Sequence, residues 1–232
     1  MHMSARDGKS GFRTAARRLN QAIERGGAMA RPRVPLLSTE RIADAAIELV
    51  DSGQAFGVNA LARRLGVTPS SLYNHVDGRD GIIELMRGRL GETYLSESPS
   101  GDWVEVVTQT MRASRRMYAE HPAIVPLLVG KTITHPVVIA SYDRLATALL
   151  GAGFPDDEVI TVIAILDSFA LGFGLDLASP DDIWKPETPT TSLARLLEQA
   201  AKGPERSDRV FEIGLEFLLD ALRLRLGRLD LD

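Results

Sequence analysis

The sequence contains no cysteine and only four histidines. Without cysteine the chain has no disulfide framework, no cysteine-ligated zinc or iron–sulfur site and no cysteine nucleophile. The histidines are far apart along the chain and form no HExxH pair, which argues against a zinc hydrolase. We therefore expect no metal, no cofactor and no catalytic residue.

Long hydrophobic runs are also missing. No stretch of about 18 consecutive apolar residues occurs, so we predict no membrane span. Residues 1–30 carry arginine and lysine throughout and lack the apolar centre of a secretory signal. These two absences predict a cytoplasmic location.

The charges that are present are unevenly distributed. The net charge is −4, yet residues 1–90 hold 14 Lys and Arg against 9 Asp and Glu, while residues 91–232 hold 13 against 22. A basic first part and an acidic remainder favour a nucleic-acid-binding head on a body that avoids nucleic acid. Because the basic surplus is modest, random sampling would also produce it, and charge alone leaves the question open.

Residues 1–37 are basic and poor in large apolar side chains. We predict a flexible arm there, with a short helix over 12–24 as one option. A second interpretation stays open, in which Met29 is the true start and residues 1–28 are an upstream extension without a role.

After the arm, apolar side chains recur with helical spacing, and no alternating pattern typical of a strand appears. The fold class predicted is all-α. The expected helices are 38–53, 58–65, 69–76, 82–90, 103–120, 123–129, 136–150, 155–177, 193–202 and 207–226.

Residues 58–76 are predicted to form a helix-turn-helix. Gly66 suits a tight turn, Thr68 is a good N-cap and Pro69 fits the first position of the next helix. With its apolar side packed inward, this second helix leaves Tyr73 and Asn74 on a free face. Such a helix fits the major groove of DNA, where side chains near its N-terminus meet base edges. Helix-turn-helix units also pack inside enzymes, so the pattern alone favours DNA binding only modestly.

Residues 39–89 resemble the DNA-binding head of the tetracycline repressor (TetR) family. The segments that carry the resemblance are Ile42-x-x-Ala45-Ala46-x-x-Leu49, Ala60-Leu61-Ala62-Arg63-Arg64-Leu65-Gly66-Val67 and Ser71-Leu72-Tyr73-Asn74-His75-Val76. Segments 142–177, 188–191 and 211–216 are similar to the regulatory domain of the tetracycline repressor, so the resemblance covers 38–226. It implies a three-helix helix-turn-helix DNA-binding domain at 38–90 and a larger helical ligand-binding and dimerisation domain at 91–232.

The resemblance also implies a homodimer in which 155–177 and 207–226 pair with their copies as a four-helix bundle. The segment 211–226 has too many apolar residues for one buried stripe, which agrees, although a central helix in a monomer core would show the same excess. A symmetric dimer implies a near-palindromic DNA operator. The implied function is a transcriptional regulator, in its simplest form a repressor that a small-molecule effector releases from the operator, while an activator of the same architecture stays open.

Two alternatives from other classes remain at this point. One is a helical enzyme, for which the acidic cluster at 156–158 is the available candidate, although acids at a helix start also favour the helix dipole. The other is a dimeric helical protein that binds a small molecule and does not read DNA specifically.

Carried over residue by residue, the resemblance implies a set of DNA contacts. The set is Asn59, Thr68, Pro69, Ser70, Tyr73, Asn74, His75 and Arg79. Tyr73, His75 and Arg79 are expected to reach phosphates, which position the protein on the duplex. Asn59 stands where the family often has arginine, so DNA shape and the basic arm are expected to add to specificity.

The tetracycline repressor itself binds its drug with magnesium, which is held by histidines and, through water, by a carboxylate. The matching positions here are Leu128, Ser168 and Asp176, and one carboxylate is too little for a hard cation. We therefore expect a pocket without metal that takes a largely apolar small molecule, for which an aromatic compound is one option. Its implied lining is Leu127, Leu128, Ile133, Tyr142, Ile165, Ser168, Phe169, Phe173, Asp176 and Trp184. Each apolar member also fits plain core packing.

Overall fold

The computed structural model describes residues 37–97, 99–177 and 179–229. All regular structure in these residues is helical, which confirms the all-α prediction. The contacts divide the chain between Leu37 and Ser38, and every helix described below belongs to the unit 38–232. The predicted arm and its optional helix at 12–24 lie outside the described residues.

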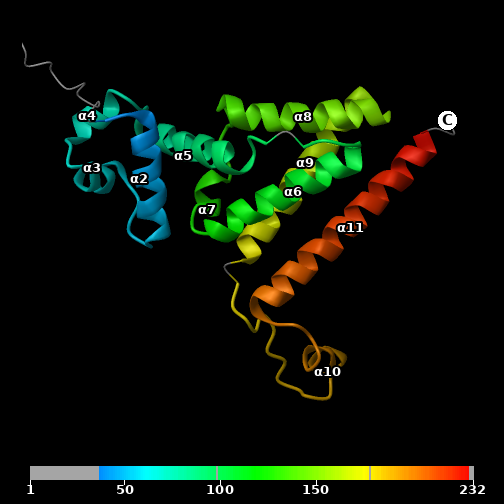
Figure 1. Ribbon diagram of the computed structural model, residues 1–232. Helices are drawn as coiled ribbons and strands as arrows, with labels where there is room; N and C mark the ends of the chain where they lie inside the picture. The colour runs from blue at the N-terminus through cyan, green and yellow to red at the C-terminus, as the bar shows by residue number, and fades with distance from the viewer. Residues whose placement is uncertain (1–36, 98, 178, 230–232) are drawn as a thin grey trace, which may run out of the picture. The chain divides into compact units, whose positions relative to one another are not determined.

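The described residues of this unit form ten helices, which follow one another along the chain (Figure 1). They are α2 (Thr39–Asp51), α3 (Val58–Leu65), α4 (Pro69–Tyr73), α5 (Gly78–Tyr94), α6 (Trp103–Glu120), α7 (Val125–Leu128), α8 (Pro136–Ala152), α9 (Asp156–Asp176), α10 (Ser192–Leu197) and α11 (Gly203–Leu229).

The helix starts and stops of the head follow from local chemistry. The Ser38 side chain accepts a hydrogen bond from the Arg41 N–H at 3.2 Å and so caps α2. Gly66 ends α3 with φ +69°, a left-handed conformation that favours glycine, and the Val67 N–H returns to the Ala62 carbonyl at 3.0 Å. Thr68 then caps α4 by accepting from the Ser71 N–H at 3.2 Å. The turn between α3 and α4 is therefore built as the sequence predicts.

Helix α5 leads from the head into the body. It begins at Gly78, earlier than the expected 82, and the predicted domain boundary at 90 falls inside it. Ile82, Ile83 and Met86 are almost fully buried, and α5 packs along α2. The head and the body thus share one continuous helix.

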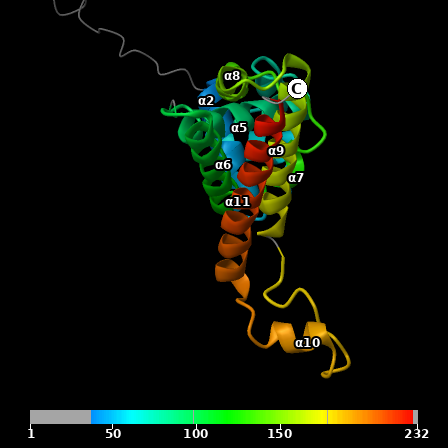
Figure 2. The ribbon, with the colours of Figure 1, turned by 90° about the vertical axis from the view of Figure 1, so that its right-hand side faces the viewer.

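Helices α6, α8 and α9 pack on one another in the body, and α11 lies along α6 and α9 (Figures 1 and 2). Phe211 and Leu215 of α11 and Leu149 and Leu166 of α8 and α9 are buried in this core. Helix α6 starts with a reciprocal capping box, in which Asp102 and Glu105 each accept the other's N–H at 3.0 Å.

Several predicted helix ends need correction. Helix α4 ends at Tyr73 rather than at 76, because the N–H groups of His75 and Val76 both return to the Leu72 carbonyl as a tight turn. Helices α7 and α10 are shorter than expected. Helix α11 begins at Gly203 instead of 207, with Pro204 in its first turn, where the missing N–H costs nothing.

Helix α9 is long and apolar enough to cross a membrane by length and composition alone, although polar residues interrupt its apolar run. The expectation drawn from the lack of a continuous run is therefore too simple. Val159, Val162, Leu166 and Ala170 of α9 are buried inside the body. Their helical spacing is that of a core helix, which passes the same composition test.

Candidate functional site

The second helix of the helix-turn-helix presents an open face. Leu72 and Val76 are buried against the rest of the head, while Tyr73 keeps 58% of its surface exposed. Ser70 and Asn74 are exposed as well. The apolar side chains thus fix the helix from behind and leave its polar side free for a partner.

All eight residues expected to contact DNA are exposed. Asn59 lies in the first turn of α3, and Pro69 and Ser70 lie in the first turn of α4. Thr68 also has a local task, because its hydroxyl caps α4 and lies 2.9 Å from the Ser71 hydroxyl. Thr68 would therefore stabilise the start of α4 even if it contacted no partner.

Arg79 is held by an aromatic neighbour that the sequence analysis did not single out. Its guanidinium lies 5.1 Å from the centre of the Phe56 ring, in the segment between α2 and α3. A cation over a ring face is attracted to it and loses some of its freedom. Arg79 is therefore partly positioned at the start of α5 before any partner binds.

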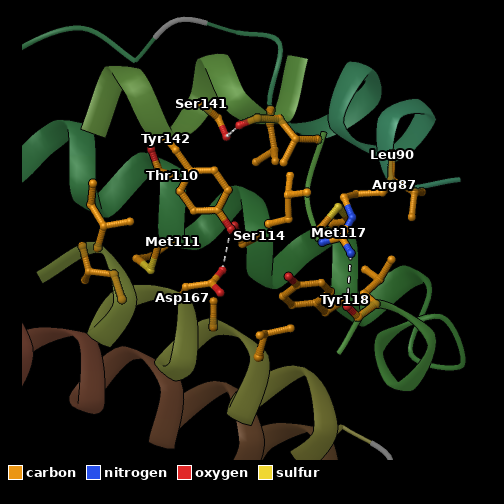
Figure 3. A pocket seen from close by; sticks show the side chains of 18 of the residues that line it. Arg87, Leu90, Thr110, Met111, Ser114, Met117, Tyr118, Ser141, Tyr142 and Asp167 are labelled. Carbon is orange, nitrogen blue, oxygen red and sulfur yellow. Dashed lines mark hydrogen bonds between the residues drawn. The ribbon is translucent and has the colours of Figure 1, made fainter. Parts of the chain in front are cut away.

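The body contains a partly enclosed cavity of about 140 Å³ (Figure 3). Helices α5 to α9 all contribute to its wall. The lining residues used below are Arg87, Thr110, Ser114, Tyr118, Leu128, Ile133, Ser141, Tyr142, Leu166, Asp167 and Ala170. A cavity with a mostly apolar wall and a few convergent polar groups is the usual form of a small-molecule site.

Two phenols and one carboxylate are among the polar groups of this wall, beside Arg87, Lys131 and three hydroxyl side chains. The Tyr142 hydroxyl donates to Asp167 Oδ1 at 2.7 Å (Figure 3). Burial raises the pKa of Tyr142 far above its usual range, and the Asp167 carboxylate adds to the rise. Burial and Asp167 also raise the pKa of Tyr118 to about 12. Both phenols therefore stay protonated near neutral pH and can act as donors.

Three of the ten residues predicted for the pocket line this cavity: Leu128, Ile133 and Tyr142. The other seven lie elsewhere. Phe169 and Phe173 stack with Phe211 of α11, with ring centres 5.5 Å or less apart.

The remaining five have other neighbours. Ile165 and Ser168 lie on the exposed side of α9, and Leu127 lies on α7 outside the lining. Trp184 is 54% exposed in the segment between α9 and α10. Asp176 accepts from Arg206 at 3.1 Å and from the Ser207 hydroxyl at 3.1 Å. The three positions that match the magnesium site of the tetracycline repressor are thus spread over different surroundings.

The helical phase of α9 explains which of its residues line this cavity. The residues that reach the cavity are 163, 166, 167, 170 and 171, which share one face at i, i+3 and i+4 spacing. The expected residues 165, 168, 169 and 173 point to other sides of the same helix. Asp167, an acid inside an apolar stretch, was the available sequence signal for the face that lines this cavity.

Comparison with known proteins decides the family. A family model described as tetracyclin repressor-like, C-terminal domain, matches residues 95–226, which is more than half of the chain. The chain belongs to this family. The resemblance of its regulatory segments to the tetracycline repressor is thereby confirmed.

Relatives of the tetracyclin repressor-like chain include a curated protein and two solved structures. The HTH-type transcriptional repressor DrrR1 of Streptomyces coeruleorubidus is 25% identical over 169 residues, which are 70% of this chain and 62% of DrrR1. Apo ActR of Streptomyces coelicolor has a TM-score of 0.71 at 24% identity and covers 84% of this chain and 99% of its own. ActR in complex with actinorhodin has a TM-score of 0.67 at 25% identity, covering 82% and 96%.

In this tetracyclin repressor-like chain, Glu84 joins the head helix α5 to the segment that borders the cavity. Its Oε1 accepts from the N–H groups of Thr134 and His135, both at 2.6 Å, and from the Thr134 hydroxyl at 3.0 Å. Its Oε2 pairs with Arg87 Nε at 3.0 Å, and Arg87 donates to the Leu128 carbonyl at 3.1 Å. Hydrogen bonds therefore connect α5 to the segment that borders the cavity.

The pKa of Glu84 records these bonds. Burial by itself would raise it, but the N–H groups of Thr134 and His135, the Thr134 hydroxyl and Arg87 together hold the pKa below its usual value. Glu84 therefore stays ionised at neutral pH, where its hydrogen bonds are charge-assisted.

Proposed function

We propose that this protein is a ligand-responsive DNA-binding transcriptional regulator, acting as a repressor that a small molecule releases from a near-palindromic operator. The observation that carries the proposal is the open polar face of α4, fixed from behind by Leu72 and Val76. The naming of DrrR1 as a transcriptional repressor and the complex of ActR with actinorhodin support it.

The DNA-reading part of the proposal assigns different tasks to the exposed head residues. Asn59, Ser70 and Asn74 carry the short polar groups that can reach base edges in the major groove. Tyr73, His75 and Arg79 lie around them and would contact phosphates. Few of these side chains are able to make two hydrogen bonds to one base. DNA shape is therefore expected to contribute to specificity.

The homodimer would form through α9 and α11. Each helix buries one side in its own body and leaves large apolar side chains exposed on another. These are Ile160, Ile165 and Leu175 on α9 and Val210, Ile213, Phe217 and Leu224 on α11. Covering such surfaces with a second copy would bury them and set two copies of α4 at a fixed separation, as a palindromic site requires.

The effector would occupy the cavity beside Tyr142 and Asp167 and would be a largely apolar molecule. A volume of about 140 Å³ is small next to the roughly 300–1,000 Å³ of common ligand sites. Either the effector is compact or its binding pushes the wall outward. An outward push on the 128–135 segment would act on α5 through Glu84 and change the separation of the heads.

We propose a regulator rather than an enzyme, with a cytoplasmic location beside its DNA. The acidic cluster that favoured an enzyme lies in the first turn of α9, where Asp156, Asp157 and Glu158 complement the helix dipole. Glu158 is also paired with Arg225, with 3.0 Å from Nε to Oε2.

Selection from random DNA duplexes with the full chain tests the proposal. We expect one near-palindromic sequence, bound with a steep salt dependence, because phosphate contacts release counterions. Tyr73→Ala should weaken binding to that sequence, and Arg195→Gln, an exposed change on α10, is the matched control. If no sequence is enriched, or if Tyr73→Ala binds as tightly as the control, the DNA-reading proposal fails.

A further inference from the structure

A second hollow opens next to the cavity, on the side of α5, α6 and α8. Its volume is about 370 Å³. It shares Leu95, Thr110 and Ser141 with the inner cavity, so these side chains border both spaces. A ligand that reaches past these side chains would occupy both spaces.

Three arginines line the outer hollow. Arg112 donates from Nε and Nη2 to the two carboxylate oxygens of Glu212, at 3.1 and 2.8 Å. Arg144 donates from one nitrogen to the Leu95 carbonyl. Arg116 is exposed and makes no hydrogen bond or ion pair with any described residue. Glu97 is the carboxylate among the lining residues.

The arginines therefore differ in what they can offer a ligand. Arg112 is largely satisfied by Glu212, whereas Arg144 keeps donors to spare and Arg116 keeps all of them. A guanidinium presents its donors in a fork that matches the two oxygens of a carboxylate or sulfonate. Arg116 and Arg144 are the groups that an anion would meet in this hollow.

We propose that the effector carries an anionic group, a carboxylate or sulfonate, which binds Arg116 and Arg144 in the outer hollow while its apolar part enters the cavity past Thr110. This inference rests on the proposed effector site. The inner cavity is also lined by two cations, but Arg87 is paired with Glu84 at 3.0 Å and Lys131 with Asp80 at 2.9 Å. The Asp167 carboxylate at this inner end repels an anion and accepts hydrogen bonds from a neutral donor, which sets the orientation of the ligand. The outer end is thus the place for the charge.

Two dyes with the same aromatic skeleton test the proposal. 8-Anilino-1-naphthalenesulfonate carries the anion, and N-phenyl-1-naphthylamine lacks it. Fluorescence titrations of the full chain compare the wild type with Arg116→Gln, with Arg116→Lys, which keeps the charge, and with Arg195→Gln as the control on α10. Thr110→Phe adds a large side chain at the border between the cavity and the outer hollow. A dye whose affinity falls in this variant binds at this site and not on the exposed apolar faces of α9 and α11.

We expect Arg116→Gln to weaken the sulfonate dye by about tenfold or more, since a charged hydrogen bond is being lost. Arg116→Lys should recover part of that loss. The neutral dye should bind Arg116→Gln and the wild type equally, and Thr110→Phe should weaken both dyes. Arg144→Gln gives an independent second variant with the same expected selectivity.

The outcomes separate the anion site from the effector site. If both dyes are weakened by Thr110→Phe but Arg116→Gln and Arg144→Gln leave the sulfonate dye unchanged, the anion proposal is overturned and the cavity stands. If neither dye responds to Thr110→Phe, the cavity is not the binding site, and both proposals fail.

Discussion

Replacing Glu84 with glutamine should loosen the connection between α5 and the cavity wall. The change keeps the size of the side chain and removes its charge. Three hydrogen bonds at Oε1 then lose charge assistance, and the new amide N–H₂ faces Arg87, whose Nε lies 3.0 Å from Oε2 in the native chain. A hydrogen bond to a charged group contributes about 1.5–3 kcal/mol, against about 0.5–1.5 kcal/mol for a neutral one.

The loss per bond is therefore about 1 kcal/mol, and since bonds to one atom are not additive we expect about 2 kcal/mol in all. Urea unfolding at fixed protein concentration measures the total. Hydrogen exchange shows where the stability is lost, because the amides of Thr134 and His135 donate directly to Glu84. These two amides should exchange roughly 30-fold faster if local opening costs about 2 kcal/mol less.

Glu92→Gln is the matched control for Glu84→Gln. Glu92 lies on the same helix, is exposed and pairs with Arg89 at 3.5 Å. Exposed pairs of this kind contribute about 0–1 kcal/mol, so this variant should leave both amides as slow as in the wild type. Unchanged exchange at Thr134 and His135 in Glu84→Gln would refute the argument that Glu84 holds this segment.

Three further predictions concern the same framework. Lowering the pH through the depressed pKa of Glu84 should remove its contribution to stability, which is fully present above the ordinary value of 4.5; urea unfolding between pH 3 and 6 should show this loss in the wild type and not in Glu84→Gln. Gly88→Ala should cost about 1–3 kcal/mol in thermal or urea unfolding, because a Cβ there would lie 2.1 Å from the His135 ring. Phe217→Glu should dissociate the proposed dimer in sedimentation experiments and weaken operator binding. If this face of α11 forms no dimer contact, the variant will sediment like the wild type.

Much of the head was predictable because its signals are local. Gly66, Thr68 and Pro69 act within one turn of chain, and each does what its backbone preference requires. Helix ends that depend on distant packing were less predictable. The beginning of α5 at Gly78 is one example, since burial of Ile82 and Ile83 against α2 extends the helix over a glycine-rich stretch.

The cavity was harder to predict than the fold because its lining depends on helical phase. An error of one residue turns a side chain by about 100° around the helix axis. Ser168 was expected in the pocket, and its neighbour Asp167 is the residue that reaches it. Contacts from α5 and α6, such as Arg87 and Ser114, come from segments far apart in sequence and leave no local pattern.

The two proposed sites are connected by the geometry of a single helix. On α5, which packs on α2, Ile83 and Met86 are buried, while Arg87 and Leu90, which follow them by four residues each, line the cavity. A helix is stiff over so short a length, so a ligand that displaces the cavity end must move the head end or break buried contacts. Exposing Ile83 and Met86 would cost about 1.5–3 kcal/mol each, which opposes any movement that separates α5 from the head. The packing of α5 therefore favours transmission of ligand binding as a movement of the whole head.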